Sequence, residues 1–230
     1  MAETALIVGT GAGLSASLAR LFHKEGMRVA LAARRTDKLA ALCAETQARA
    51  YACDATKPDQ VAALFAAVTK DIATPDIVVY NASGRARGPI AELKPDDVLN
   101  AIMVGCYGGF LVGQQAARAM LKAGHGTILF TGASASVKGF AQSSAFAMGK
   151  FGLRGLTQSM ARELAPQNIH VAHFVIDGAI RQPNDTRGEG RGPDALLEPD
   201  AIAASYLAVH RQHRSAWTAE IELRPWVEKY

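Results

Sequence analysis

A lysine on a helix made of small residues is the first candidate for chemistry in this sequence. Lys150 follows Phe146 by about one helical turn in the stretch SSAFAMGKFGL, residues 143–153. Small side chains let another molecule approach a helix closely, and a lysine offers that molecule a positive charge and hydrogen-bond donors. We therefore interpret Lys150 as a functional residue, with a solvated helix lysine as the alternative.

The second candidate is a glycine-rich stretch, GTGAGLS, that directly follows an apolar run at 4–8. Gly9, Gly11 and Gly13 permit a tight turn and a close approach of the backbone to a pyrophosphate. The helix that follows presents free N–H groups and the positive end of its dipole. The spacing is not G-x-G-x-x-G, and a plain strand-to-helix turn is the alternative. The position after the first strand nevertheless favours dinucleotide binding.

The end of the next predicted strand, 28–33, indicates which dinucleotide is bound. An NAD site has an acidic residue about 20 residues after the glycines, which binds the ribose 2′-hydroxyl. Here Arg34 and Arg35 follow the strand, and Asp37 comes later, in a first helical turn where acids are common. A guanidinium pairs well with a 2′-phosphate. We expect Arg34 to select NADP(H), with NAD(H) less favoured and two solvated arginines as the alternative.

Alternating strands and helices must position these residues. Apolar runs predict strands at 4–8, 28–33, 48–53, 76–80, 127–131, 169–176 and 218–223. Helices are predicted from Pro95 towards Lys122, over 142–165 and near 199–211, besides those between the first four strands. This alternation predicts an α/β fold, a Rossmann-like doubly wound parallel sheet in a single domain over residues 1–230. Ligands then bind at the carboxyl ends of the strands, and we expect the polar loop near 181–198 to be a substrate lid.

Together these motifs resemble the short-chain dehydrogenase/reductase family along essentially the whole chain. The family's T-G-x-x-x-G-x-G motif is similar to the glycine stretch, and its N-N-A-G motif is similar to Tyr80-Asn81-Ala82-Ser83. Its Y-x-x-x-K motif becomes F-x-x-x-K here. The resemblance implies a one-domain Rossmann fold, NAD(H) or NADP(H) as cofactor, a small-molecule substrate, and a homodimer or homotetramer.

The resemblance also implies a set of cofactor-binding residues. Asp54 and Ala55 would face the adenine, although a turn cap is the alternative for Asp54. Lys150 would bind the nicotinamide ribose, and Ile180 would lie near the nicotinamide amide. The complete implied set is Gly9, Gly11, Gly13, Leu14, Arg34, Asp54, Ala55, Asn81, Ala82, Ser83, Lys150, Gly178 and Ile180.

The catalytic positions depart most from the family pattern. Phe146 stands for the tyrosine, Ala133 for the serine and Gly105 for the asparagine, while Lys150 remains. Hydride delivered to a ketone leaves an alkoxide, and phenylalanine has no proton to give it. Loss of a positioned acid typically costs about 10² to 10⁴ in rate. We expect Lys150, Ser134 and Ser143 to be the catalytic residues, the serines (with Ser144 as a further option) orienting a water.

Three functions are compatible with these features. The first is an NADP(H)-dependent reductase of a small carbonyl, imine, quinone or activated C=C, with a non-standard proton donor. The second is a catalytically inactive NADP(H)-binding scaffold or regulatory subunit, and the third is a catalytic partner whose site another chain completes. We rank the reductase first because the loop near 181–198 has the composition of a lid.

Composition argues against several other classes. The chain is 49% hydrophobic and 20% charged, as in globular proteins. The net charge of +4 is spread along the sequence, whereas nucleic-acid binders concentrate it. The three cysteines lack metal-ligand spacing, so we expect no metal. We find no apolar run of about 18 residues and no secretory leader pattern, and we expect a cytoplasmic protein with reduced thiols.

Overall fold

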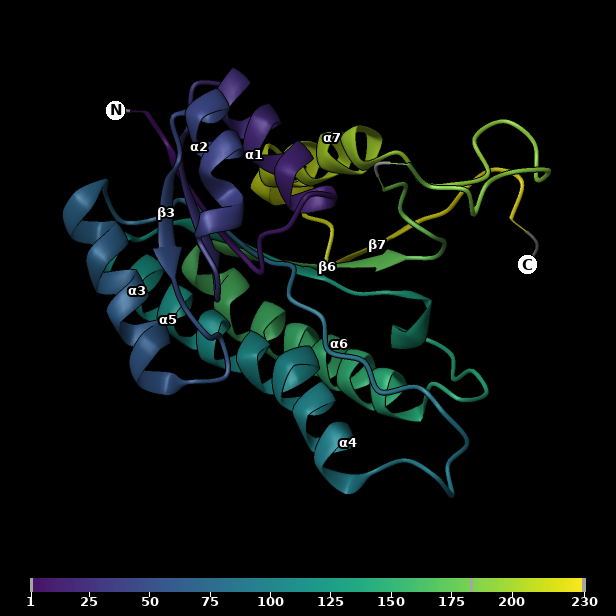
Figure 1. Ribbon diagram of the computed structural model, residues 1–230. Helices are drawn as coiled ribbons and strands as arrows, with labels where there is room; N and C mark the ends of the chain where they lie inside the picture. Colours follow the sequence, from purple (N-terminus) through teal and green to yellow (C-terminus); the bar gives the residue numbers. More distant parts are fainter. Residues whose placement is uncertain (1, 183, 229–230) are drawn as a thin grey trace.

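A parallel sheet of seven strands forms the centre of the molecule (Figure 1). This computed structural model describes residues 2–182 and 184–228. The strands are β1 (Thr4–Val8), β2 (Arg28–Ala33), β3 (Arg49–Ala52), β4 (Ile77–Tyr80), β5 (Gly126–Thr131), β6 (Ile169–Ile176) and β7 (Glu220–Leu223). Their order is β3-β2-β1-β4-β5-β6-β7, and every neighbouring pair is parallel. The predicted doubly wound α/β fold is confirmed.

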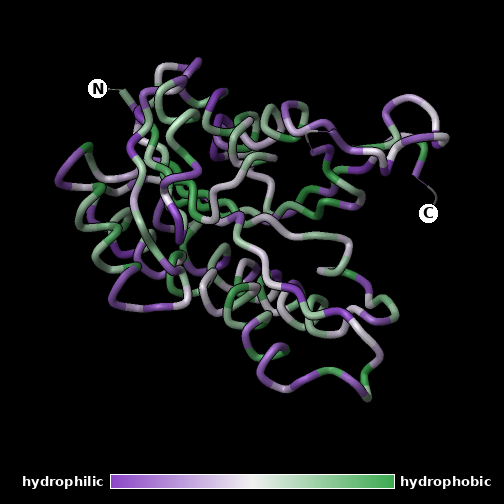
Figure 2. Tube along the Cα trace, viewed as in Figure 1, coloured by the Kyte–Doolittle hydropathy of each residue, from purple (hydrophilic) through white to green (hydrophobic). Residues whose placement is uncertain are grey.

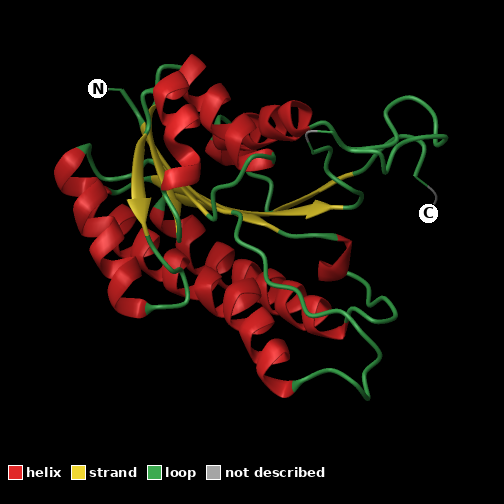
Figure 3. Ribbon diagram, in the orientation of Figure 1, coloured by secondary structure: helices red, strands yellow, loops and turns green. Residues whose placement is uncertain are grey.

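Helices cover both faces of this sheet (Figure 3). One face carries α1 (Leu14–Lys24), α2 (Ala40–Thr46) and α7 (Pro199–His210), and the other carries α3 (Pro58–Asp71), α4 (Pro95–Ile102), α5 (Gly108–Ala123) and α6 (Ser144–Leu164). The chain builds the sheet from β1 outwards to β3 and then restarts at β4, on the other side of β1. The strand order therefore reverses between β1 and β4, which places a crevice at their carboxyl ends.

Two apolar cores explain why the strands read as continuous hydrophobic runs. All five residues of β1 and all eight of β6 are buried, because alternate side chains enter opposite helix layers. One core joins β1 to α1 and α7 through Ile7 and Phe22, and the other joins it to α3 and α5 through Leu6 and Val112. Figure 2 shows the hydrophobic colour following the sheet.

The long helix predicted from Pro95 to Lys122 contains an unpredicted wide turn. A π-helical segment, Met103–Tyr107, joins α4 to α5. The Tyr80 hydroxyl donates a hydrogen bond to the Val104 carbonyl within this turn, at 2.5 Å. A Cβ built on Gly105 would lie 3.3 Å from the Gly149 Cα, so the turn packs backbone to backbone against α6. The wide turn is thus stabilised by residues of β4 and α6. The periodicity of the helix sequence alone contains no information about these contacts, so the turn was not predicted.

A loop projects beside the sheet after β6 (Figure 1). Its base is closed by a bridge between Ile180 and Leu197 and by an ion pair between Arg181 and Glu198. Pro183, within the predicted lid, lies outside the described residues. Across residues 2–182 and 184–228, each helix is too short or too polar to cross a membrane.

Candidate active site

Two adjoining cavities lie at the carboxyl ends of the strands. The smaller, about 220 Å³, is lined by residues that include Arg34 and Asp54. The larger, about 570 Å³, is lined by residues that include Lys150. Asn81 and Ser83, in the loop after β4, line both cavities. One extended ligand can therefore run from Arg34 past β4 to Lys150.

The glycine turn after β1 is shaped for an anion. Gly9 has φ +89°, and a Cβ built there would lie 2.4 Å from the Ala82 backbone nitrogen, so only glycine fits. Asn81 Nδ2 donates to Ser15 Oγ at 2.7 Å, and that hydroxyl donates to the Gly9 carbonyl at 3.2 Å. No side chain caps the start of α1, and its first turn holds no acid. The positive end of the helix is thus left for a phosphate group.

A third cavity, about 550 Å³, lies between the glycine turn and α2. Arg34, Arg35 and Lys38 line it, and no acidic residue is among its described lining. Arg20 also lines it, but Glu45 binds that guanidinium at 2.7 Å. The cavity therefore collects positive charge beside the glycine turn. Lys38 was missed at the sequence level, although the run RRTDK contained its signal.

Asp54 caps a turn and also lines a cavity. Its Oδ1 accepts hydrogen bonds from the backbone nitrogen and the hydroxyl of Thr56, at 3.0 and 2.8 Å. Burial pushes the pKa of Asp54 up, but these bonds outweigh burial and hold the pKa below its usual value. Asp54 is therefore a turn cap, and with Ala55 it also lines the smaller cavity.

The remaining predicted cofactor residues divide into two groups. Gly178 and Ile180 line the larger cavity. The Leu14 side chain is instead buried in the core around α1, because it points away from the turn that its backbone helps to form. Gln182, which was not predicted, lies over the turn: a Cβ on Gly13 would be 2.7 Å from its Nε2.

Lys150 is buried at the floor of the larger cavity. Its side chain extends from α6 to β5, where Nζ donates a hydrogen bond to the Thr131 carbonyl at 2.6 Å. The residue is only 3% exposed. Burial, helped by the nearby Arg85 guanidinium, lowers the pKa of Lys150 to about 8. Its remaining donors are available to a ligand, and the ammonium holds a proton that leaves near neutral pH.

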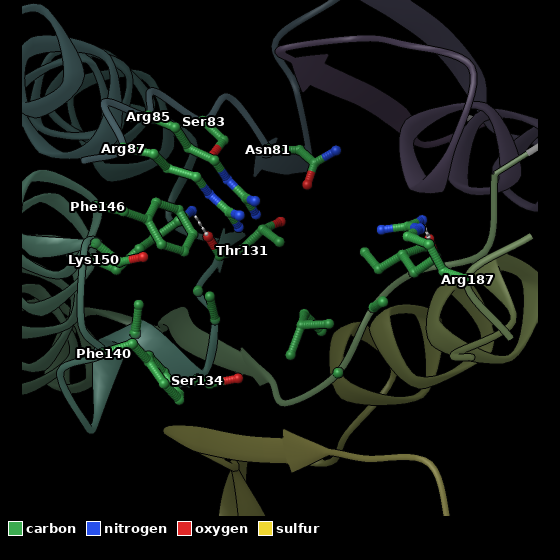
Figure 4. A pocket seen from close by; sticks show the side chains of 18 of the residues that line it. Asn81, Ser83, Arg85, Arg87, Thr131, Ser134, Phe140, Phe146, Lys150 and Arg187 are labelled. Atoms are coloured by element: carbon green, nitrogen blue, oxygen red, sulfur yellow. Dashed lines mark hydrogen bonds between the residues drawn. The ribbon is translucent and has the colours of Figure 1, made fainter. Parts of the chain in front are cut away.

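Phe146 lies near two cations (Figure 4). Its ring centre is 5.8 Å from Lys150 Nζ and 4.3 Å from Arg85 Cζ. Ser134 and Ser143 also line this cavity, whereas Ser144 is not among its lining residues. Within the described part of the chain, no tyrosine lines the cavity. The arrangement can hold a cofactor and a small molecule against a buried ammonium, with no phenol beside it.

A cluster of polar side chains centred on the buried His173 links α6, β6 and β7. His173 on β6 is fully buried, and its Nε2 lies 3.3 Å from the Ser136 hydroxyl. Its Nδ1 is 3.3 Å from Glu220 on β7, and Arg154 on α6 binds the same carboxylate at 2.7 and 2.8 Å. Burial is the main cause that lowers the pKa of His173 to about 4. The group therefore ties α6 to the sheet with a neutral imidazole.

The fold and this site define a dinucleotide-binding protein, with a glycine turn after β1 and a buried lysine on α6. The family model for short chain dehydrogenase matches residues 3–184. The chain belongs to the short-chain dehydrogenase/reductase family and is an oxidoreductase of that type. The resemblance predicted from the sequence is thereby confirmed.

Relatives cover most of the chain. Sorbitol-6-phosphate 2-dehydrogenase from Escherichia coli (strain K12) is 29% identical over 191 residues, which span 80% of this chain and 74% of that protein. The crystal structure of a short-chain dehydrogenase from Rhodopseudomonas palustris matches with 37% identity and a TM-score of 0.85, over 97% and 99% of the two chains. A metagenomic short-chain oxidoreductase solved in complex with NADP matches with 28% identity and a TM-score of 0.84, over 97% and 96%.

Arg85 and Arg87 are further functional candidates that sequence reasoning missed. Both lie in the loop after β4, and both line the larger cavity. The sequence analysis counted them only within a net charge spread along the chain. Their signal was the basic pattern in NASGRARG, directly after the motif that resembles N-N-A-G. A loop after a β-strand in this fold faces the ligand, so charge there carries more meaning than charge on an outer helix.

Proposed function

We propose that this protein is an NADP(H)-dependent reductase of a small carbonyl, imine, quinone or activated C=C, with a proton donor other than tyrosine. The observation that carries the proposal is the position of Lys150. Its ammonium lies at the inner end of the larger cavity, which adjoins the one beside Arg34 through Asn81 and Ser83. The relative solved with NADP supports the choice of cofactor.

The residues present fit NADP(H). The uncapped first turn of α1 and Gly9 would hold the pyrophosphate, and Arg34, Arg35 and Lys38 would hold the 2′-phosphate. Asp54, Ala55 and Ala82 would surround the adenosine, while Lys150, Gly178 and Ile180 would surround the nicotinamide riboside. Bound NADPH would supply the hydride and be oxidised to NADP⁺. The product then needs one proton, which the chain or water must provide.

Lys150 can hold that proton. An ammonium with a pKa near 8 is a good general acid at neutral pH, and this one lies beside the space in which a substrate would sit. Ser134 and Ser143 line the same space and can orient a water between Lys150 and the substrate oxygen. A serine hydroxyl alone is too weak an acid to act as the proton donor. In this proposal the serines therefore orient the water, and the Lys150 ammonium provides the positive charge and the proton.

The alternative is an inactive NADP(H)-binding scaffold or regulatory subunit, and Phe146 is the observation that favours it. The tests are cofactor binding by calorimetry, followed by NADPH oxidation with ketones, imines, quinones and activated alkenes. The reductase predicts micromolar binding and turnover with at least one class. Binding without turnover supports the scaffold, unless addition of a partner protein restores turnover. Failure to bind either pyridine nucleotide refutes both.

A homo-oligomer is part of the proposal. Large apolar side chains are exposed on the helices of one face, namely Leu99, Tyr107, Phe110, Leu121, Met148 and Phe151. Exposed apolar surface of this kind is typical of subunit contacts. We expect a dimer or tetramer by light scattering, and the charged substitution Phe110→Glu should shift it towards smaller species.

A further inference from the structure

Two arginines reach the substrate end of the larger cavity without a carboxylate partner. Arg85 and Arg87 extend from the loop after β4 towards Thr131 and Phe146 (Figure 4). Among the described residues, no ion pair joins either arginine to an acidic side chain. Arg85 instead places its guanidinium 4.3 Å above the Phe146 ring. Both arginines are exposed, so solvent balances their charges in the free protein and both remain open to an anion that enters the cavity.

The described lining of the cavity strengthens this reading. It contains Lys150 and three arginines but no aspartate or glutamate. The third arginine, Arg187, enters from the opposite wall, where it binds Asp185 and the Ile180 carbonyl. Arg187 therefore has a carboxylate partner, whereas Arg85 and Arg87 form no ion pair with an acidic side chain among the described residues. Partial burial, with repulsion from Arg87 and Arg187, lowers the pKa of Arg85.

The neighbouring surface does not supply an anion for this pair. Arg85 and Arg87 also line an adjacent cavity of about 410 Å³, whose lining includes Glu92 and Asp97. Neither carboxylate forms an ion pair with them. The cofactor phosphates already have the glycine turn and the cationic cavity beside α2. The pair at the substrate end is thus unassigned.

We propose that Arg85 and Arg87 bind an oxyanion on the substrate, so that the protein acts on a small carbonyl compound bearing a carboxylate or phosphate group. This inference rests on the proposed reductase function and narrows its substrate class. Guanidinium groups pair with both kinds of oxyanion through two parallel hydrogen bonds. The apolar walls formed by Phe140, Phe146 and Ile176 leave room for a short carbon chain between that anion and the reacting carbonyl.

Matched substrate pairs test the proposal. Acetoacetate is compared with methyl acetoacetate, and dihydroxyacetone phosphate with dihydroxyacetone, by NADPH oxidation. We expect the charged member of at least one pair to have a kcat/KM at least about tenfold higher, as one charge-assisted hydrogen bond predicts. The pair in which the charged member is preferred shows whether the site recognises a carboxylate or a phosphate. Added salt should reduce the preference.

Variants then assign the preference to the arginines. Arg85→Met and Arg87→Met should each reduce it about tenfold or more, and Arg87→Lys should retain part of it. The KM for NADPH should stay within about twofold. Arg118→Met, an exposed arginine on α5 outside this cavity, is the matched control and should change neither quantity. Weaker NADPH binding in the Arg85 and Arg87 variants, with an unaltered preference, would mean that these arginines serve the cofactor, and it would overturn the proposal.

Direct binding measurements test the inference even in the absence of turnover. The same four compounds are titrated by calorimetry into the NADP⁺ complex, in which no reduction can occur, and into the free protein. Binding of a charged compound that both Met variants lose supports the inference. Equal or no binding of charged and neutral members contradicts it. NADPH is titrated first and alone, so that failure of the proposed function is recognised separately.

Discussion

The Lys150 ammonium donates a hydrogen bond to the Thr131 carbonyl at 2.6 Å, joining the N-terminal half of α6 to the end of β5. The lysine is therefore held in place before any ligand arrives. Its burial disfavours the charged form, so the protein carries a cost for having a cation at this point. Such a cost is typical of a functional group and atypical of a surface lysine.

The first prediction concerns the pH dependence of stability. The pKa of Lys150 is about 8 in the folded protein, below the ordinary 10.5, so the unfolded chain binds more protons between these values. The free energy of unfolding of the free protein should therefore rise with pH across this window, by on the order of 1 to 3 kcal/mol. Urea unfolding of the wild type and of Lys150→Met measures this contribution, which the variant should lack. The exposed Lys122→Met is the control, and a Lys150→Met profile parallel to the wild type would contradict the prediction.

The second prediction restores a phenol. Phe146→Tyr should raise kcat for ketone reduction by about tenfold to a hundredfold, because the new hydroxyl would lie beside Lys150 and Arg85, which favour its ionised form. Steady-state NADPH oxidation gives the value. Phe140→Tyr, a second phenylalanine of the same cavity, is the control and should give no gain. An unchanged or lower kcat at Phe146→Tyr, with NADPH still bound, would show that Lys150 and water already supply the proton efficiently.

The third prediction concerns cofactor choice. Arg34→Ala should raise the KM for NADPH about tenfold to a hundredfold and leave that for NADH nearly unchanged, since a charge-assisted hydrogen bond contributes about 1.5 to 3 kcal/mol. Arg214→Ala, exposed and near β7, should leave both KM values as they are. If both cofactors weaken equally at Arg34→Ala, the arginine has no role in recognising the 2′-phosphate.

The fourth prediction concerns acid. The folded protein holds His173 neutral, with a pKa near 4 against an ordinary 6.5, so the unfolded chain binds more protons between these values. The free energy of unfolding should fall as pH drops through this window, by on the order of 1 to 3 kcal/mol. Burial also lowers the pKa of His170 and His210, which adds to the fall. Thermal unfolding of His173→Gln should show a shallower dependence than the wild type, whereas the exposed His213→Gln should not.

The fifth prediction isolates the close approach at the glycine turn. Gly9→Ala and Gly26→Ala both place a side chain at positive φ, but a Cβ at Gly26 meets open space and one at Gly9 meets the Ala82 backbone. Gly26→Ala should cost about 1 to 2 kcal/mol of unfolding free energy. Gly9→Ala should cost clearly more and should weaken NADPH binding as well. Equal losses in chemical denaturation would mean that the loop after β4 yields easily.

Much of the fold could be read from local patterns, because strands buried on both faces are continuous apolar runs and glycines punctuate the helices. Gly124, for example, ends α5 at φ +76°. The π-helical turn could not be read, because it depends on Tyr80 reaching Val104 across the sequence. The residues implied for the cofactor could be named, but Leu14 shows that a motif position does not fix where its side chain points.

The substrate end of the site was harder to predict for a different reason. From the sequence alone, arginines in a loop are interpreted as solvent-exposed surface residues. Only the topology of the sheet shows whether that loop lies beside the ligand-binding crevice. The position of Arg85 in the site is evident only from its contact with Phe146, which lies on α6 and is distant in the sequence. Lys38 differs, because it lies only four residues after Arg34 and lines the same cavity, so its role could have been inferred from the local sequence.

The contact between Gly105 and Gly149 makes positions 105 and 146, two of the three that the sequence analysis matched to the family's polar reaction residues, differ in how easily they accept a polar side chain. At 146 a larger polar ring has only to extend into an open cavity. At 105 a Cβ would lie 3.3 Å from the Gly149 Cα, so an asparagine there requires the two backbones to move apart by a few tenths of an ångström. An engineer, or an evolving lineage, can therefore introduce a phenol at 146 with the backbone unchanged, whereas an amide at 105 needs a backbone shift as well.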